Sequence, residues 1–312
     1  MPVLTAALAR VAEGVPTALA IVVETEGSVY ARTSTLAVFV GDSHIGWISG
    51  GCLEPALLAS AEIAVRETTL RLIEIDTRDD TAMFSGAATG CRGRQIVAFI
   101  PLCAVAGLPE IVDRWQAGAG LQFEIAGGGR IRISSGEILF EAELPVVCEE
   151  PMSGHSAWSI LIPPPPRVLL LGAGPEALHL VPLLRDLGWK VVSREPREAW
   201  QGRLTEDDRS SSAVPLDRLL MDFEPDATLA MHHSFELDLE ALSALASSPC
   251  TFIGLLGPAR RREDLLKLLP EELRLELTHR LRSPVGLSLG GTGPAGIALS
   301  ICAQLEQWRH GA

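Results

Sequence analysis

Residues 167–177 read Arg-Val-Leu-Leu-Leu-Gly-Ala-Gly-Pro-Glu-Ala, which is an apolar run, a pair of spaced glycines and the start of a helical pattern. This order of strand, glycine turn and helix is typical of a Rossmann-like domain. Gly172 would allow the tight turn, Gly174 the close approach of a phosphate, and Ala177 close contact between helix and strand. Glu195, 23 residues after Gly172, could accept a hydrogen bond from a ribose hydroxyl. The turn therefore predicts a nucleotide or pterin site; the alternative is a degenerate turn that only packs.

The chain beyond this turn repeats the alternation of apolar run and helical segment. The predicted strands are Val168–Leu171, Lys190–Arg194, Ala227–Ala230 and Thr251–Leu255. Strands that alternate with helices form a parallel sheet with helices on both faces. Residues 167–312 are therefore predicted to form a Rossmann-like domain.

A proline-rich segment before the turn predicts a domain boundary. Residues 163–166 are four consecutive prolines, which lack amide donors and favour a stiff polyproline spacer. We therefore predict a linker over residues 151–166 and a separate domain over residues 1–150. The apolar and alternating runs of that first domain indicate mixed α+β structure. The predicted fold class is thus α/β: an N-terminal α+β domain followed by a Rossmann-like parallel-sheet domain.

Composition excludes several classes of protein. The 312 residues carry a net charge of −13, which argues against a general nucleic-acid or anionic-membrane binder, because such proteins need a basic face. The sequence has no long uninterrupted apolar run, so a membrane-spanning helix is not expected. The 6 cysteines form no C-x-x-C pair, which is typical of reduced thiols in the cytoplasm.

Two segments of the first domain each place one cysteine among glycines. Residues 48–54 read Ile-Ser-Gly-Gly-Cys-Leu-Glu, and residues 89–93 read Thr-Gly-Cys-Arg-Gly. Glycines let the backbone come close to a bound group while the thiol points at it. Cys52 and Cys91 are therefore candidate ligand-contacting residues, and the alternative for each is a small packing residue beneath a turn. The remaining four, Cys103, Cys148, Cys250 and Cys302, lie in ordinary contexts and are expected to be structural.

Further segments complete a recognisable pattern over residues 18–102 and 167–304. They are Thr25–Tyr30, Gly46–Glu54, Asp76–Asp80, Gly90–Gly93, Phe252–Gly257, Ser283–Leu287, Pro294 and Ile297–Ile301. In this order they resemble the XdhC/CoxI family, accessory factors that mature xanthine dehydrogenase and related molybdenum hydroxylases. The resemblance implies a protein that binds the molybdenum cofactor (molybdopterin), supports its sulfuration and delivers it to a xanthine-dehydrogenase-type molybdoenzyme. It also implies a cysteine desulfurase as a further partner, and a homodimer.

The chemistry of molybdopterin fits such residues. Glycine amides can take its phosphate, carboxylates such as Glu54 or Asp76 can accept pterin N–H groups, and a thiol can approach the metal or its sulfur. Cys52 and Cys91 are the expected metal contacts. The candidate cofactor-binding residues are Gly50, Gly51, Cys52, Glu54, Asp76, Gly90, Cys91, Gly93, Gly172, Gly174, Ala177, Glu195, His233, Gly254 and Gly257.

The second domain departs from the family pattern. The chain has His232-His233-Ser234 where the family usually has Thr-His-Asp, so His233 matches the family histidine. Acidic positions of the family are replaced by Ser288, Gly296 and Gln304. Several carboxylates are thus missing from the expected second-domain cleft, which predicts altered ligand specificity there. The cysteine motifs of the first domain are intact.

Three functions remain open at this point. The leading hypothesis is a cofactor carrier and insertion chaperone, more a carrier than a catalyst. The enzyme alternative is a nicotinamide-dependent oxidoreductase, suggested by Gly172, Gly174 and Glu195, although Tyr30 is the only tyrosine and no tyrosine-lysine pair is supplied. The third is a scaffold that binds a partner dehydrogenase and no cofactor.

Overall fold

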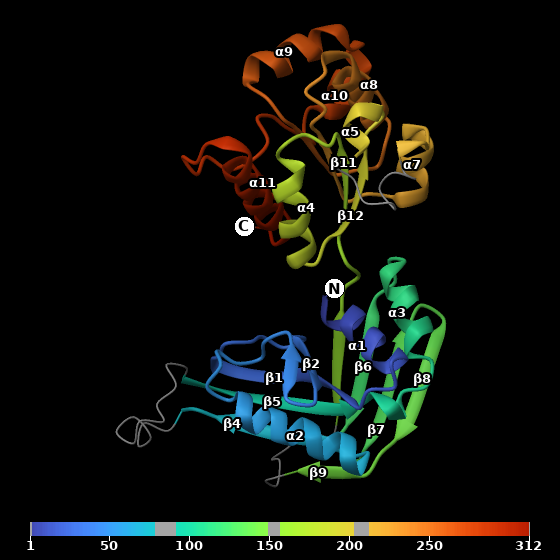
Figure 1. The fold of residues 1–312 in the computed structure, drawn as a ribbon, viewed down its shortest axis with the longest axis vertical. Coiled ribbons are helices and arrows are strands. Elements are labelled where there is room, and N and C mark those ends of the chain that lie inside the picture. Colours follow the sequence, from blue (N-terminus) through green and yellow to red (C-terminus); the bar gives the residue numbers. More distant parts are fainter. Residues whose placement is uncertain (1, 79–91, 149–156, 203–211, 312) are drawn as a thin grey trace. The chain divides into compact units, whose positions relative to one another are not determined.

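The computed structural model describes residues 2–78, 92–148, 157–202 and 212–311. The chain divides into two compact units, Pro2–Pro165 and Pro166–Ala312, which are described separately below (Figure 1).

The first unit contains helices, strands and one short 3-10 helix. In chain order these are α1 (Pro2–Ala12), β1 (Thr17–Ser28), β2 (Leu36–Val40), β3 (Ser43–Ile45), α2 (Glu54–Glu67), β4 (Leu70–Asp76), β5 (Arg92–Pro101), η2 (Leu102–Ala104), α3 (Leu108–Gln116), β6 (Leu121–Ala126), β7 (Arg130–Ser135), β8 (Ile138–Glu143), β9 (Val146–Cys148) and β10 (Ala157–Ile162).

One sheet of this unit carries the cysteine motif. Within the described residues it has six strands in the order β3-β2-β1-β5-β4-β9, and β1 pairs antiparallel with both β2 and β5. Helix α2 lies along one face of this sheet (Figure 1), where Leu57, Ala61 and Ala64 join Val97 and Phe99 in a buried apolar cluster. The glycine-rich segment before α2 is therefore held at the end of this face.

The second sheet of this unit corrects the predicted linker. Strand β10 pairs antiparallel with β6 along its whole length, in the described sheet order β10-β6-β7-β8. Trp158, Ile160 and Ile162 are buried and alternate with exposed residues, as a strand with one buried face requires. The predicted linker over 151–166 is therefore wrong for residues 157–162. The alternation that marks this strand is present in the sequence, directly before the proline run.

The second unit alternates strands and helices. Its elements are β11 (Arg167–Leu171), α4 (Ala177–Asp186), β12 (Lys190–Arg194), α5 (Glu198–Gln201), α7 (Leu216–Phe223), β13 (Ala227–Ala230), α8 (Phe235–Ala246), β14 (Phe252–Leu255), α9 (Ala259–Leu268), α10 (Glu271–Leu277), β15 (Leu281–Arg282) and α11 (Gly293–Arg309).

All strand pairs of the second unit's sheet are parallel. The order in the described residues is β12-β11-β13-β14-β15. Apolar residues of α7, α8, α9 and α10 form one buried cluster with the strands, and those of α4 and α11 form another. The predicted fold class is confirmed: an N-terminal mixed domain is followed by a Rossmann-like domain. In such sheets ligands bind beyond the carboxyl ends of the strands, where the strand order reverses, here between β11 and β13.

No helix in the described ranges is long and apolar enough to cross a membrane.

Candidate functional site

A small pocket lies beside Cys52, at the end of the sheet face that α2 covers. It encloses about 30 Å³, enough for one or two water molecules or a small chemical group. Its described lining carries no charged side chain and consists of Val29, Tyr30, Ile48, Ser49, Gly50, Cys52, Leu53, Ile75, Thr77, Gly93 and Gln95. The Cys52 thiol is free and exposed. The pocket therefore offers an accessible thiol next to an uncharged recess.

The segment that carries Cys52 is fixed by its own side chains. Ser49 Oγ donates a hydrogen bond to Glu54 Oε1 at 2.7 Å, and the Gly51 N–H donates to Ser49 Oγ at 3.1 Å. Gly51 has φ +100°, a conformation that favours glycine. Glu54 Oε2 lies 3.5 Å from His44 Nε2. Glu54 does not line the pocket; it holds the loop that presents Cys52.

The second cysteine motif reaches the same pocket through Gly93. A Cβ at Gly93 would lie 2.6 Å from Val29 Cγ1 and 2.7 Å from backbone oxygens of Glu26 and Ser28, so only glycine lets β5 pass here. Thr77 Oγ1 donates to the Gly93 carbonyl at 2.8 Å. The two motifs thus meet at one pocket although about 40 residues separate their cysteines. Gly90 and Cys91 themselves lie outside the described residues.

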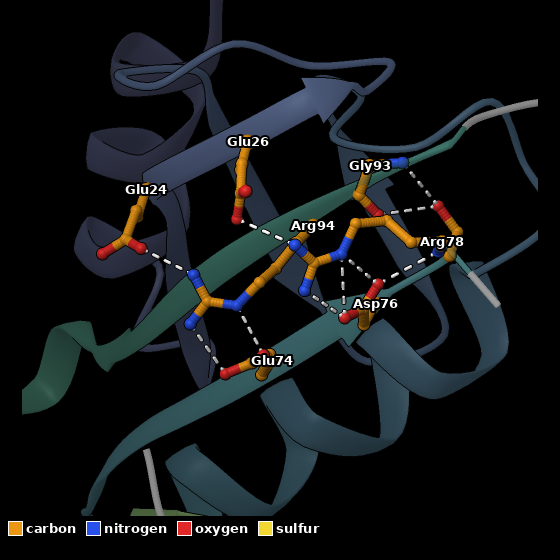
Figure 2. A network of polar contacts seen from close by, with 8 residues as sticks. Glu24, Glu26, Glu74, Asp76, Arg78, Gly93 and Arg94 are labelled. Atoms are coloured by element: carbon orange, nitrogen blue, oxygen red, sulfur yellow. Dashed lines mark hydrogen bonds and ion pairs between the residues drawn. The ribbon is translucent and has the colours of Figure 1, made fainter. Parts of the chain in front are cut away.

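Asp76 lies on the other face of the same sheet. Residues alternate between faces along a strand, so Ile75 and Thr77 face the pocket while Asp76 faces away from it. Figure 2 shows the ion-pair network on this opposite face. Arg78 donates to Asp76 Oδ2 at 2.6 Å and to Glu26 Oε2 at 2.9 Å. Asp76 is therefore occupied by Arg78 and is not brought together with Cys52.

Arg94 forms the more buried half of this network. It donates to Glu24 Oε1 at 2.6 Å and to both oxygens of Glu74, at 2.5 and 2.9 Å (Figure 2). Trp158 Nε1 also donates to Glu24, at 3.0 Å. The hydrogen bond from Arg94 lowers the pKa of Glu74, and the hydrogen bonds from Arg78 lower the pKa of Asp76 to about 2. The network ties β1, β4 and β5 together behind the pocket wall.

The glycine turn of the second unit has the geometry of its motif but is closed by its own side chains. Gly172 has φ +121°, and Ala177 is the buried first residue of α4. A Cβ at Gly174 would lie 3.0 Å from Glu176 Oε2 and 3.1 Å from His233 Nε2. These two atoms are hydrogen-bonded to each other at 3.1 Å, and the Glu176 carboxylate is nearly buried. A carboxylate thus occupies the space that a phosphate would take above Gly174.

The expected role of Glu195 is corrected by its surroundings. Its carboxylate is fully buried and accepts four hydrogen bonds, from the Ala173 and Arg197 N–H groups and from Nε and Nη2 of Arg197. Burial alone would raise the pKa of Glu195, but these hydrogen bonds outweigh it and lower the pKa. Four is about the number that a carboxylate can accept. Glu195 therefore stabilises the glycine turn and has no free lone pair for a ribose.

The two adjacent histidines have different environments. His233 is about half exposed and has φ +57°, which is uncommon for a residue other than glycine. His232 is buried, and its Nδ1 lies 3.0 Å from Asp238 Oδ1. Asp238 also accepts from Arg261 Nη2 at 2.8 Å. The sequence pattern pointed to His233 and not to this buried set of His232, Asp238 and Arg261, because only the fold joins α8 and α9 to the end of β13.

Glu176→Ala is expected to open the turn to nucleotides. We expect the wild-type chain to show no saturable binding of NAD⁺ below about 1 mM, because the Glu176 carboxylate repels a phosphate. The variant removes that charge and frees the space above Gly174, so its affinity should rise by about tenfold or more. Isothermal titration calorimetry measures this, with Glu198→Ala, an exposed carboxylate on α5, as the matched control. Micromolar binding of NAD⁺ by the wild type would contradict the closed turn.

Gly254 and Gly257 have separate roles. A Cβ at Gly254 would lie 2.5 Å from Leu229 and 2.7 Å from Val285, so this glycine serves packing within the sheet. Gly257 lines a second, larger cavity of about 430 Å³ at the ends of β14 and β15 and the start of α11. Ser288 and Gly296, two positions at which the sequence resemblance led us to expect acidic residues, line the same cavity. Gln304 instead accepts a hydrogen bond from the Gly286 N–H at 2.7 Å.

Sequence reasoning missed several residues of the Cys52 pocket. Tyr30 contacts Gly50, its ring lying 3.6 Å from the position of a Cβ there. Thr77 and Gln95 also lie in the pocket wall; Gln95 belongs to β5, and Thr77 directly follows the neighbouring strand β4. The one signal for these residues in the sequence was Gln95, a polar residue directly before the buried apolar run 96–100. A buried strand rarely carries an amide side chain at such a position.

Comparison with known proteins agrees with both units. Residues 168–305 match the family described as the XdhC Rossmann domain, and residues 10–76 match the XdhC and CoxI family. A Bacillus subtilis (strain 168) protein whose name describes it as a probable component of xanthine dehydrogenase is 28% identical over 93% of this chain and 92% of its own length. The protein YqeB of Escherichia coli (strain K12) is 29% identical over 47% of this chain and 28% of its own length.

A solved structure supports the fold over nearly the whole chain. It is a Bacillus halodurans protein described as a xanthine dehydrogenase, with a TM-score of 0.76 and 24% sequence identity. The similarity covers 99% of this chain and 96% of that one.

Proposed function

Because the chain belongs to the XdhC and CoxI family, we propose that it is an accessory factor of a xanthine-dehydrogenase-type enzyme and that its cargo is that enzyme's molybdenum cofactor. The single observation that carries the proposal is the convergence of Gly50, Cys52 and Gly93 on one pocket with an exposed thiol. The similarity, over nearly the full length, to a protein named as a probable component of xanthine dehydrogenase supports the same client class.

The pocket beside Cys52 suits one end of such a cargo. Its described lining is uncharged and its volume of about 30 Å³ admits a small group, so most of a larger molecule would lie outside it, against Tyr30 and the exposed thiol. A thiolate is a good ligand for a soft metal centre or its sulfur. The hydrogen bond between Ser49 and Glu54 holds the loop in place, so presenting Cys52 costs less conformational entropy at the moment of binding.

The proposed role is that of a carrier. The protein would protect the cofactor, support its sulfuration by a cysteine desulfurase and insert it into the client molybdoenzyme. A second copy of the chain would complete the enclosure of the cargo, so the proposed carrier is a homodimer. Cys91, two residues before Gly93, would supply the second thiol.

Cys52→Ser and Cys91→Ser test the proposal. Both should lower the pterin and molybdenum content of protein isolated from a molybdate-fed host by about tenfold or more, because a hydroxyl is a poor ligand for a soft metal. The thermal midpoint should stay within about 1 °C, since serine is nearly isosteric and the Cys52 thiol is already exposed. Cys103→Ser, another exposed thiol of the first unit, is the matched control.

Mass spectrometry of the released pterin and metal analysis give the readout. Equal pterin and molybdenum contents in all three variants and the wild type would show that the thiols do not bind the cargo. If the wild-type protein carries no pterin but still binds the dehydrogenase, the carrier hypothesis is wrong and the protein is a scaffold.

A further inference from the structure

Gln95 stands out among the residues around the Cys52 pocket. It lies on β5 directly before the apolar run Ile96–Ile100, it is only 5% exposed, and it forms part of the pocket wall. Its neighbours across the ladder are Thr25 on β1 and Ile75 on β4. A polar side chain this deeply buried normally has its hydrogen-bonding groups satisfied.

Only one end of the Gln95 amide is satisfied within the described part of the protein. Nε2 donates to the Ile48 carbonyl at 3.4 Å, and this contact sets the orientation of the amide, because the reverse orientation would place two oxygens against each other. Oε1 has no hydrogen-bond partner among the described residues. The unpaired Oε1 is a cost in stability for the free protein, and a leucine of about the same volume would remove it at the loss of the weak 3.4 Å contact to the Ile48 carbonyl.

We propose that Gln95 Oε1 accepts a hydrogen bond from the group of the cargo that enters the pocket beside Cys52. This inference rests on the proposed carrier function. It adds a statement about which part of the cargo enters the pocket. A carboxamide oxygen attracts an N–H, O–H or S–H group and repels the oxygens of a phosphate. The pocket therefore takes a small hydrogen-bond donor, and the phosphate of the cargo lies elsewhere.

Two parts of the cargo carry such a donor: the amino edge of the pterin, and a protonated oxygen or sulfur on the metal. Both share the chemistry that Gln95 recognises, and both fit a recess of about 30 Å³ as a single protruding group. A comparison of the binding of metal-free and metal-containing cargo distinguishes these two donors.

The test compares wild type, Gln95→Leu and Gln122→Leu as full-length chains. Gln122 on β6 is a glutamine of the same unit that bonds Ser159 at 2.8 Å and lies outside the pocket. Each chain is isolated from a molybdate-fed host, from a molybdate-starved host that makes metal-free pterin, and from a host that makes no pterin. Pterin and molybdenum per chain are then measured, together with the thermal midpoint of the cargo-free protein.

We expect Gln95→Leu to retain about tenfold less cargo than the other two chains, the effect of losing one buried hydrogen bond. We also expect the thermal midpoint of its cargo-free form to stay within a few degrees of the wild type, because the unpaired Oε1 and the weak Nε2 contact to the Ile48 carbonyl are lost together. Loss of both metal-free and metal-containing pterin assigns the donor to the pterin edge. Loss of the metal-containing form alone assigns it to the metal.

Equal retention by a loaded wild type and Gln95→Leu would overturn the inference while leaving the carrier function intact. A midpoint of cargo-free Gln95→Leu more than about 10 °C below that of the wild type would also overturn it, because the amide would then serve the fold and the loss of cargo would follow from unfolding. A wild type without pterin from either pterin-making host would overturn the carrier function and this inference together.

Discussion

Gly172→Ala is expected to destabilise the second unit by about 4 kcal/mol. Gly172 has φ +121°, which costs a residue with a Cβ about 1–3 kcal/mol. The added Cβ would also lie 2.6 Å from the Met231 carbonyl oxygen, 2.7 Å from its carbon and 2.8 Å from the His232 nitrogen. Overpacking of this kind costs about 1–3 kcal/mol more.

The backbone at Met231 cannot yield easily. The Met231 N–H donates to the Leu171 carbonyl at 2.8 Å, so a shift of either strand breaks the junction of β11 and β13. Urea denaturation followed by tryptophan fluorescence and circular dichroism measures the loss as a lower midpoint of one of two transitions. Gly202→Ala is the control, because no atom of the described residues lies within 4 Å of a Cβ there and its φ is −60°. A loss below about 1 kcal/mol for Gly172→Ala would contradict the close approach of the two strands.

Arg94→Met is expected to destabilise the first unit by about 3 kcal/mol. The Arg94 side chain is 11% exposed and pairs with Glu24 and Glu74, each 23% exposed. Methionine preserves the apolar stem of the side chain and leaves two partly buried carboxylates without their cation. Removal of one partner from a buried ion pair typically costs about 3–5 kcal/mol, and the residual exposure places this site at the lower end.

Arg132→Met is the matched control. Arg132 also contacts two carboxylates, Glu124 and Glu141, but all three side chains are about half exposed. Exposed ion pairs contribute little, so the control should lose at most about 0.5 kcal/mol. Equal losses for the two variants in urea denaturation would show that the Arg94 network is no stronger than a surface pair.

The difference between wild type and Arg94→Met should shrink in acid. Arg94 lowers the pKa of Glu74 below its ordinary value of 4.5 in the folded state. A depressed carboxyl pKa gives stability that is present above the unfolded pKa and is lost as the pH falls through the folded pKa. The free energy of unfolding of the wild type should therefore approach that of the variant below about pH 4.5.

This network connects stability to the candidate site. Asp76 and Arg94 are directly opposite each other on β4 and β5, one position away from Thr77 and Gly93, which line the Cys52 pocket. The charged face thus holds the two strands in register behind the uncharged face that receives the cargo. Because side chains alternate between faces, a shift by one residue would replace the pocket lining by charged groups.

Several features were readable from the chain alone. Strands Lys190–Arg194 and Ala227–Ala230 occur where the apolar runs placed them, and the turn at Gly172 joins β11 to α4 as its glycines required. These features depend on neighbours in sequence: a run of buried side chains, a turn of fixed geometry, a helix start. The cysteine motifs were also legible, because each carries its glycines within a few residues.

The partners of the polar side chains depended on tertiary structure. Glu195 matched the spacing of a ribose-binding carboxylate, yet the fold placed Arg197 and the Ala173 N–H around it and used all of its lone pairs. Gln95 had no motif at all, and only the pairing of β1, β5 and β4 brings it beside Cys52. Periodicity reports how the chain bends and which face is buried, but a hydrogen bond is decided by whichever distant group the strand register and helix packing bring within about 3 Å.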